Sequence, residues 1–236
     1  MVLFSILVSD FAKIVSTVVR ELKVQQRKDV MKLKGYGGAS IVSIIMQTEV
    51  GSSMVVSLEP EDRLALLKAR DDSGSTFLHK ANIDSDTSSS FLSLVRALKP
   101  KEKMELLMIR DHEQSTPLHQ AASWKGDTEI IKGLLDGISS GDRLMLLMMQ
   151  DKQFSTPLHK AAHWHGNGGV IAKLLDSLKS EDRLRLLMMP DHELSIALIR
   201  AASVSGDPDV IQNLLNGLEP ADKLRLLMVR DKEQST

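Results

Sequence analysis

A forty-residue internal repeat constrains the fold of this chain more than any other feature of its sequence. The segment Ser115-Thr-Pro-Leu-His-Gln-Ala-Ala122 returns forty residues later as Ser155-Thr-Pro-Leu-His-Lys-Ala-Ala162. A second landmark, Asp-Arg-Leu-x-Leu-Leu, keeps the same spacing at 142–147 and 182–187. Self-similarity at a fixed period is typical of proteins built by stacking copies of one structural unit.

The same frame divides most of the chain without insertions or deletions. The apolar start of the chain lacks a preceding basic residue, so we interpret it as part of an amphipathic helical segment that caps the stack, with an export signal as the alternative. The expected parts are this N-terminal segment at 1–34, a degenerate repeat at 35–74, whole repeats at 75–114, 115–154, 155–194 and 195–234, and the start of a truncated further repeat at 235–236.

Each repeat begins with the pattern of a helix N-terminus. A threonine is placed as the N-cap, and the proline after it occupies the first helical position, where a missing N–H costs nothing. A glycine about nine residues later is expected to end the helix in the left-handed conformation. These residues are Thr116, Pro117 and Gly126 in one repeat and Thr156, Pro157 and Gly166 in the next.

Two further helices are expected in each repeat. Asp127 and Asn167 are placed as N-caps of a second helix, whose apolar stripe includes Ile130, Ile131, Leu134 and Leu135. The Asp-Arg-Leu landmark predicts a short third helix with an acidic first turn, and we interpret its recurring Asp-Arg pairs as capping and surface ion-pairing groups. We expect three leucines of this helix, Leu144, Leu146 and Leu147, to be mostly buried. Four methionines, Met104, Met108, Met148 and Met188, are expected to fill the core, with a soft binding surface as the alternative.

The order Thr-Pro-Leu-His-x-Ala-Ala, glycine, a Val/Ile pair and Leu-Leu resembles the ankyrin repeat over roughly 35–236. The resemblance implies an all-α, ankyrin-type helical repeat solenoid; a HEAT- or armadillo-like stack is the alternative that the period alone would suit. Ankyrin units are about 33 residues long, so a forty-residue repeat is a variant. Gln114, Phe154 and Leu194 stand where Gly74 occupies the turn, so we expect a remodelled hairpin.

Three histidines, His79, His119 and His159, occupy the same position of successive repeats. A ligand or catalytic group is needed once, whereas a folding element is needed in every unit. The resemblance implies that these imidazoles bridge adjoining turns by hydrogen bonds. His159 and His163 have the spacing of a helical metal pair but lack the glutamate of a His-Glu-x-x-His motif, so we expect no metal site at this pair. We also expect no catalytic or cofactor site.

Composition narrows the classes of partner. The formal net charge of −1 argues against a nucleic-acid groove or a polybasic membrane anchor, and no small-molecule substrate is expected. The chain has no cysteine, which excludes disulfides and thiolate metal sites. A reducing compartment fits this composition, and we expect the cytoplasm, with the nucleus as the alternative.

The resemblance also implies where a partner protein would bind. In ankyrin-like repeats the two residues after Ala-Ala and the tips of the turns contact partners. The corresponding positions here are Ser123, Trp124, His163 and Trp164, the preceding Gln120 and Lys160, and the tips His112, Glu113, Lys152 and Gln153.

Two alternatives remain open at this point. Trp124 and Trp164 are either exposed anchors for a partner or core residues turned against the next repeat. The function expected is that of a protein-binding adaptor or scaffold. The alternative is the targeting portion of a larger enzyme or receptor whose effector domain lies outside this chain.

Overall fold

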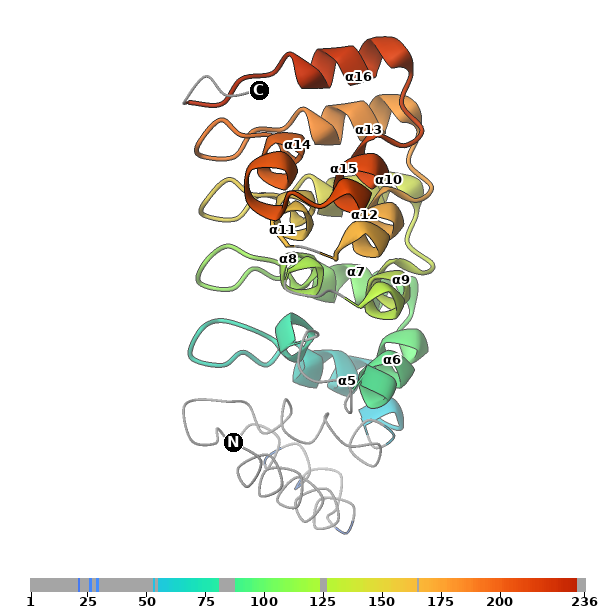
Figure 1. Cartoon of the computed structure of the whole chain (residues 1–236). Helices are drawn as coiled ribbons and strands as arrows, with labels where there is room; N and C mark the ends of the chain where they lie inside the picture. The colour runs from blue at the N-terminus through green and yellow to red at the C-terminus, as the bar shows by residue number, and fades with distance from the viewer. Residues whose placement is uncertain are drawn as a thin grey trace. The chain divides into compact units, whose positions relative to one another are not determined.

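The computed structural model describes residues 55–80, 88–123, 127–164 and 166–232, with the isolated residues 21, 26, 29 and 53 (Figure 1). Twelve α-helices and no β-strand occur in these ranges, in agreement with an all-α repeat fold. The chain divides into two compact units, residues 1–112 and 113–236. The expected N-terminal cap at 1–34, except for residues 21, 26 and 29, lies outside the described residues, as do residues 35–52 and 54 of the degenerate repeat.

The described part of the first unit includes three α-helices and a 3₁₀ turn. These are α5 (Pro60–Leu67), the turn Phe77–Lys80, α6 (Ser88–Ala97) and α7 (Pro100–Leu107). Proline occupies the first position of α5 and α7, as its missing N–H favours.

The second unit contains three copies of a three-helix repeat. The first helices are α8 (Pro117–Ala122), α11 (Pro157–Ala162) and α14 (Ala197–Arg200). The second helices are α9 (Thr128–Leu135), α12 (Gly168–Leu175) and α15 (Pro208–Leu215). The third helices are α10 (Ser140–Leu147), α13 (Ser180–Leu187) and α16 (Pro220–Leu227). Equivalent helices pack on one another in the order α8, α11, α14 and α9, α12, α15 (Figure 1).

The first helix is shorter than the sequence pattern predicts. Thr116 and Thr156 are N-caps with extended backbone, and the prolines after them begin α8 and α11. Both helices end at the second alanine rather than at the glycine. Gly166 does take the left-handed conformation (φ 84°), but four residues beyond the helix end, and Gly126 lies outside the described residues.

The last of these repeats has helical structure as far as the glycine. There α14 continues into a π-helical turn, Ala201–Ser205, which is followed by the left-handed Gly206 (φ 60°). Among the second helices, Asp127 caps α9 by accepting a hydrogen bond from the backbone N–H of Glu129 (2.7 Å). Asn167 does not cap α12 in this way: its Nδ2 donates to the carbonyl oxygen of Ala122, in the preceding repeat (3.2 Å).

The core of the second unit is built from the apolar faces of the second and third helices. Ile131, Leu134, Leu147 and Leu187 have no exposed surface. Leu144, which we expected to be mostly buried, is only half-buried. Two of the methionines expected to fill the core, Met108 and Met188, are exposed at the C-terminal ends of α7 and α13, so that interpretation is wrong for them.

The arginines of the Asp-Arg pairs do not make the expected surface ion pairs. Arg143 donates to the carbonyl oxygens of Leu135 (3.2 Å) and Asp176 (2.9 Å). Arg183 donates in the same way to Leu175 (2.9 Å) and Asn216. Each guanidinium therefore satisfies the C-terminal carbonyls of the second helix in its own repeat and in the next, where the helix dipole favours a cation.

In the first unit the equivalent arginine has a different partner. Nη2 of Arg63 lies 2.7 Å from Oε1 of Glu102, and both side chains are nearly buried. Burial by itself would raise the pKa of Glu102, but hydrogen bonds from Lys99 and Arg63 and the charge of Arg63 outweigh burial and lower it. This ion pair links α5 to α7 within the first unit.

Candidate functional site

A hydrogen-bonded histidine holds each of the first helices α8 and α11 against the next repeat, whereas α14 has Ile199 at the equivalent position. Nδ1 of His119 accepts from the backbone N–H of Thr116 (3.2 Å), and Nε2 donates to the carbonyl oxygen of Ser155 (2.9 Å). His159 repeats this with Thr156 (3.2 Å) and with Ser195 (3.1 Å). Both rings are buried, and burial lowers the pKa of His159 despite the hydrogen bond with Ser195. Because Nδ1 accepts and Nε2 donates in both rings, both bonds of each ring require the neutral imidazole, which serves here as a structural group.

A tight hairpin precedes each first helix. In residues 151–155 the backbone N–H of Asp151 donates to the carbonyl oxygen of Ser155 (3.0 Å). Oδ1 of Asp151 accepts from the backbone N–H groups of Gln153 (2.8 Å) and Ser155 (3.0 Å). Residues 191–195 form the same network around Asp191. The aspartate side chain therefore stabilises the turn by accepting hydrogen bonds from two of its backbone N–H groups.

The expectation of a remodelled hairpin is wrong. Gln114, Phe154 and Leu194 take the left-handed conformation, with φ of 59°, 54° and 59°, as Gly74 does with φ of 77°. The turn keeps its geometry although its glycine is replaced. A side chain with a Cβ is disfavoured in this conformation, so the hydrogen bonds of the hairpin must offset the cost.

Backbone hydrogen bonds join the tips of successive hairpins. Lys152 donates to the carbonyl oxygen of Glu113 (3.0 Å), His192 to that of Gln153 (3.0 Å), and Lys232 to that of Glu193 (3.1 Å). The side chains at these tips are exposed. The hairpins therefore form one continuous edge with varied polar side chains.

Two cations on the first helices bind the carboxylates of the hairpins. Nζ of Lys160 lies 2.6 Å from Oδ2 of Asp151. Nη2 of Arg200 lies 2.6 Å from Oδ2 of Asp191 and 2.7 Å from Oε2 of Glu193. Burial alone would raise the pKa values of Asp151 and Asp191, but Lys160 and Arg200 respectively outweigh it and lower both. Both aspartates are therefore ionised at neutral pH.

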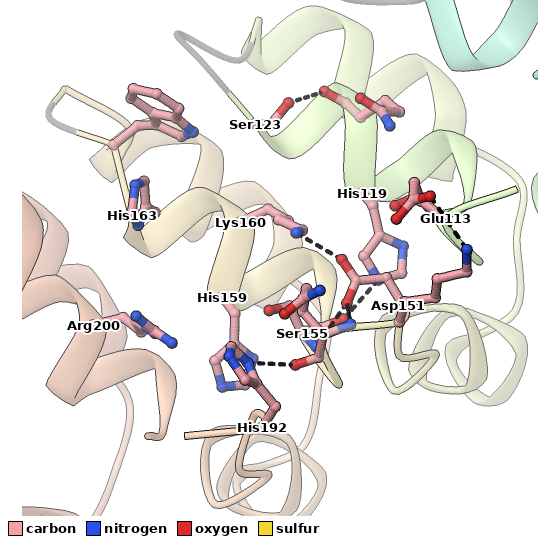
Figure 2. Close-up of a pocket in the computed structure, with 15 residues that line it drawn as sticks. Glu113, His119, Ser123, Asp151, Ser155, His159, Lys160, His163, His192 and Arg200 are labelled. Atoms are coloured by element: carbon pink, nitrogen blue, oxygen red, sulfur yellow. Dashed lines mark hydrogen bonds and ion pairs between the residues drawn. The ribbon is translucent and has the colours of Figure 1, made fainter. Parts of the chain in front are cut away.

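The hairpins and first helices of the second unit enclose a groove of about 500 Å³ (Figure 2). The hairpin side contributes Glu113, Ser115, Asp151, Lys152, Gln153, Ser155 and His192. The helix side contributes His119, Gln120, Ser123, His159, Lys160, His163, Trp164 and Arg200.

Most of the residues singled out from the sequence as partner contacts line this one groove. They are Glu113, Gln120, Ser123, Lys152, Gln153, Lys160, His163 and Trp164. His112 is an exposed residue of the first unit, and Trp124 lies outside the described residues. Sequence reasoning missed Asp151 and Arg200. Arg200 could have been found, because it occupies the same repeat position as Gln120 and Lys160.

The sequence left open whether Trp164 is an exposed anchor for a partner or a core residue, and the structure places it between these two alternatives. Its side chain is half-buried, and its ring lies edge-on to that of His163, with centroids 5.1 Å apart and an interplanar angle of 77°. His163 itself is exposed. Burial, together with the charges of Arg200 and Lys160, lowers the pKa of His163. The pair presents an aromatic surface and a neutral imidazole to the groove.

Histidine and acidic side chains from the described ranges line the groove. Within these ranges, no group of three or more His, Asp or Glu side chains is arranged to hold a metal ion. None of the described helices is long and apolar enough to cross a membrane. The groove instead combines an aromatic side chain with hydrogen-bonding and charged groups, which are suited to recognising a polypeptide.

Comparison with known proteins agrees with the geometry. Residues 113–143 match the family model described as Ankyrin repeat. No curated protein matches the chain. The matched segment spans the first helix with its Thr-Pro-Leu-His motif, the second helix and the start of the third. Residues 113–143 are therefore an ankyrin repeat, and the described helices form an all-α repeat fold of the ankyrin type.

Proposed function

We propose that this protein is a binding module that engages a partner protein in the groove of the second unit. Ankyrin repeats are a generic protein–protein interaction motif and are typically non-catalytic. The first support comes from what varies between repeats. Asp151 and Asp191, and His119 and His159, recur because they build the hairpins and bridges, whereas Gln120, Lys160 and Arg200 differ at one equivalent position. Variation on a constant scaffold is how repeat proteins acquire specificity.

The observation that carries the proposal is the position of Trp164 in the groove. A half-buried indole beside an exposed imidazole offers a large rigid contact area and a hydrogen-bonding group together. Tryptophan is among the residues that most often dominate binding energy at protein interfaces. We propose as partner contacts the eight residues that were singled out from the sequence and that line the groove: Glu113, Gln120, Ser123, Lys152, Gln153, Lys160, His163 and Trp164. Trp124 and His112, which were singled out from the sequence alone, are proposed with them.

Removal of the indole tests this proposal. Trp164→Ala should lower the affinity for a partner captured by the wild-type chain by about tenfold or more, because interface tryptophans commonly contribute 2 kcal/mol or more. Met145→Ala is the matched control, because Met145 is an exposed apolar residue of α10 that does not line the groove. Circular dichroism and thermal melting should show that both variants stay folded. Equal affinity of the two folded variants for the partner would contradict the proposal.

A further inference from the structure

Two cations in the groove retain hydrogen-bonding capacity after their ion pairs are made. Nε and Nη2 of Arg200 are occupied by Asp191 and Glu193, whereas Nη1 has no partner among the described residues. Lys160 uses one ion pair, with Asp151, although an ammonium group carries three N–H donors. Both residues line the groove. Donors on positively charged groups therefore remain available to a ligand there.

His163 adds a third polar group at the same place. Its ring contacts that of Trp164, and no hydrogen bond to it occurs within the described ranges. Besides burial, the charges that lower its pKa are those of Arg200 and Lys160. Both cations are therefore close enough for their charge to act on this imidazole, and each also binds a carboxylate.

Two of the carboxylates that bind these cations are buried. The side chain of Asp151 is 4% exposed and that of Asp191 is fully buried, so both lie beneath the cations that they bind. Glu193 is the partly exposed carboxylate near Arg200, and it is hydrogen-bonded to Nη2. The buried carboxylates hold Lys160 and Arg200 in place and leave their remaining donors for the groove.

We propose that Lys160, His163 and Arg200 form a subsite for one carboxylate side chain, an aspartate or glutamate, of the bound partner. This inference rests on the proposed function, since it names the chemistry that the groove recognises. Trp164 packs against the neighbouring apolar part of the partner segment. A singly charged carboxylate suits the subsite better than a phosphate, because the two-pronged edge of Arg200 is occupied by Asp191 and one Nη remains.

The affinity of the subsite for a carboxylate should depend on pH. The charges that act on His163 are those of Lys160 in α11 and Arg200 in α14, and these cations bind Asp151, Asp191 and Glu193. A partner carboxylate next to the imidazole favours its protonated form and supplies the missing counter-charge. Binding should therefore strengthen as the pH falls from 7.5 to 5.5, a range in which the partner carboxylate stays ionised.

The test is selection of peptides from a random displayed library with the full chain at pH 6. The selected peptides should share an aspartate or glutamate at a fixed position, and its replacement by the amide should weaken binding about tenfold. Peptides that lose binding to Trp164→Ala but show no acidic preference would overturn the subsite and leave the proposed function standing. If no selected peptide depends on Trp164, both fail.

Variants of the chain complete the test. The wild type should bind the selected peptide at least about threefold more tightly at pH 5.5 than at 7.5, and His163→Gln should remove this difference. Arg200→Gln should weaken binding. Arg185→Gln should not, because Arg185 is an exposed residue of α13 that does not line the groove. An unchanged pH profile in folded His163→Gln would contradict the subsite. Tighter binding of a peptide with phosphoserine at the acidic position would contradict the carboxylate assignment.

Discussion

Nε2 of His159 donates a hydrogen bond to the carbonyl oxygen of Ser195, 3.1 Å away in the following repeat. Nδ1 of the same ring accepts from the backbone N–H of Thr156. A ring that accepts at Nδ1 must carry its proton on Nε2, so only the neutral imidazole makes both bonds. The connection between one first helix and the next hairpin therefore depends on the charge state of a buried histidine.

We expect this dependence to appear as a loss of stability in mild acid. Burial lowers the pKa of His159 in the folded state below its ordinary value of 6.5. Protons therefore bind preferentially to the unfolded chain, so the stabilisation is complete above pH 6.5 and is lost as the pH falls through that value towards the folded-state pKa. Urea unfolding at pH 7.5 and 5.5 should show a lower midpoint at pH 5.5.

The variant His159→Gln separates this group from the other titrating residues. At pH 7.5 it should cost about 1–3 kcal/mol, because buried hydrogen-bonding groups lose their partner. The additional loss of stability that this variant shows when the pH is lowered from 7.5 to 5.5 should be smaller than the loss shown by the wild type. An equal loss in both proteins would mean that His159 does not contribute to the acid sensitivity.

A second prediction concerns the turn of the hairpin. Phe154 has a φ of 54° and is 57% exposed, so its side chain contributes strain with little burial. Phe154→Gly should raise the free energy of unfolding by about 1 kcal/mol, because glycine adopts this conformation without a steric penalty. Gln153→Gly is the matched control: Gln153 is an exposed neighbour without a positive φ, and glycine there should destabilise. Equal effects of the two substitutions would contradict the account of strain.

The arginine that joins successive second helices gives a third prediction. Arg183→Ala removes the donors to Leu175 and Asn216 and should cost about 1–3 kcal/mol in chemical denaturation. Arg185→Ala is the control, since Arg185 is exposed and its contact with Asp182 is 3.6 Å long. That substitution should change stability by less than about 0.5 kcal/mol. Similar losses for both would show that the carbonyl contacts of Arg183 are unimportant.

The third helices allow the same residue type to be compared in two environments. Leu187 in α13 has no exposed surface, whereas Leu227, forty residues later in α16, is 55% exposed. Leu187→Ala should cost about 2–5 kcal/mol as a core truncation. Leu227→Ala should cost less than about 1 kcal/mol, because little apolar area is lost. Thermal melts of the two variants should differ clearly, and coincident melts would disprove the assigned burial.

The local features of the fold were predictable because they depend on residues close together in sequence. A threonine before a proline begins the first helix, and the apolar stripe of the second helix follows from its own spacing. The positions of Gln120, Lys160 and Trp164 in the groove also follow the repeat frame.

Two features that sequence reasoning missed depend on partners about one repeat away. Asn167 reaches back to Ala122, and Arg183 reaches forward to Asn216, so neither makes only the local contacts that its neighbours in sequence suggest. The left-handed Phe154 is set by the Asp151 network of the hairpin, which overrides the preference of an isolated phenylalanine. Burial of the Asp151 carboxylate under Lys160 likewise needs the folded hairpin.

The most direct measurement of the central claim is site-specific photo-cross-linking in a lysate. A photoreactive amino acid is placed at Gln153, an exposed residue that lines the groove, or at Glu181, an exposed residue of α13 that does not. If the groove binds the partner, a discrete cross-linked protein should form from position 153 and not from position 181, and Trp164→Ala should abolish it. Equal cross-linking from both positions, or a position-153 product that is unaffected by Trp164→Ala, would contradict the claim.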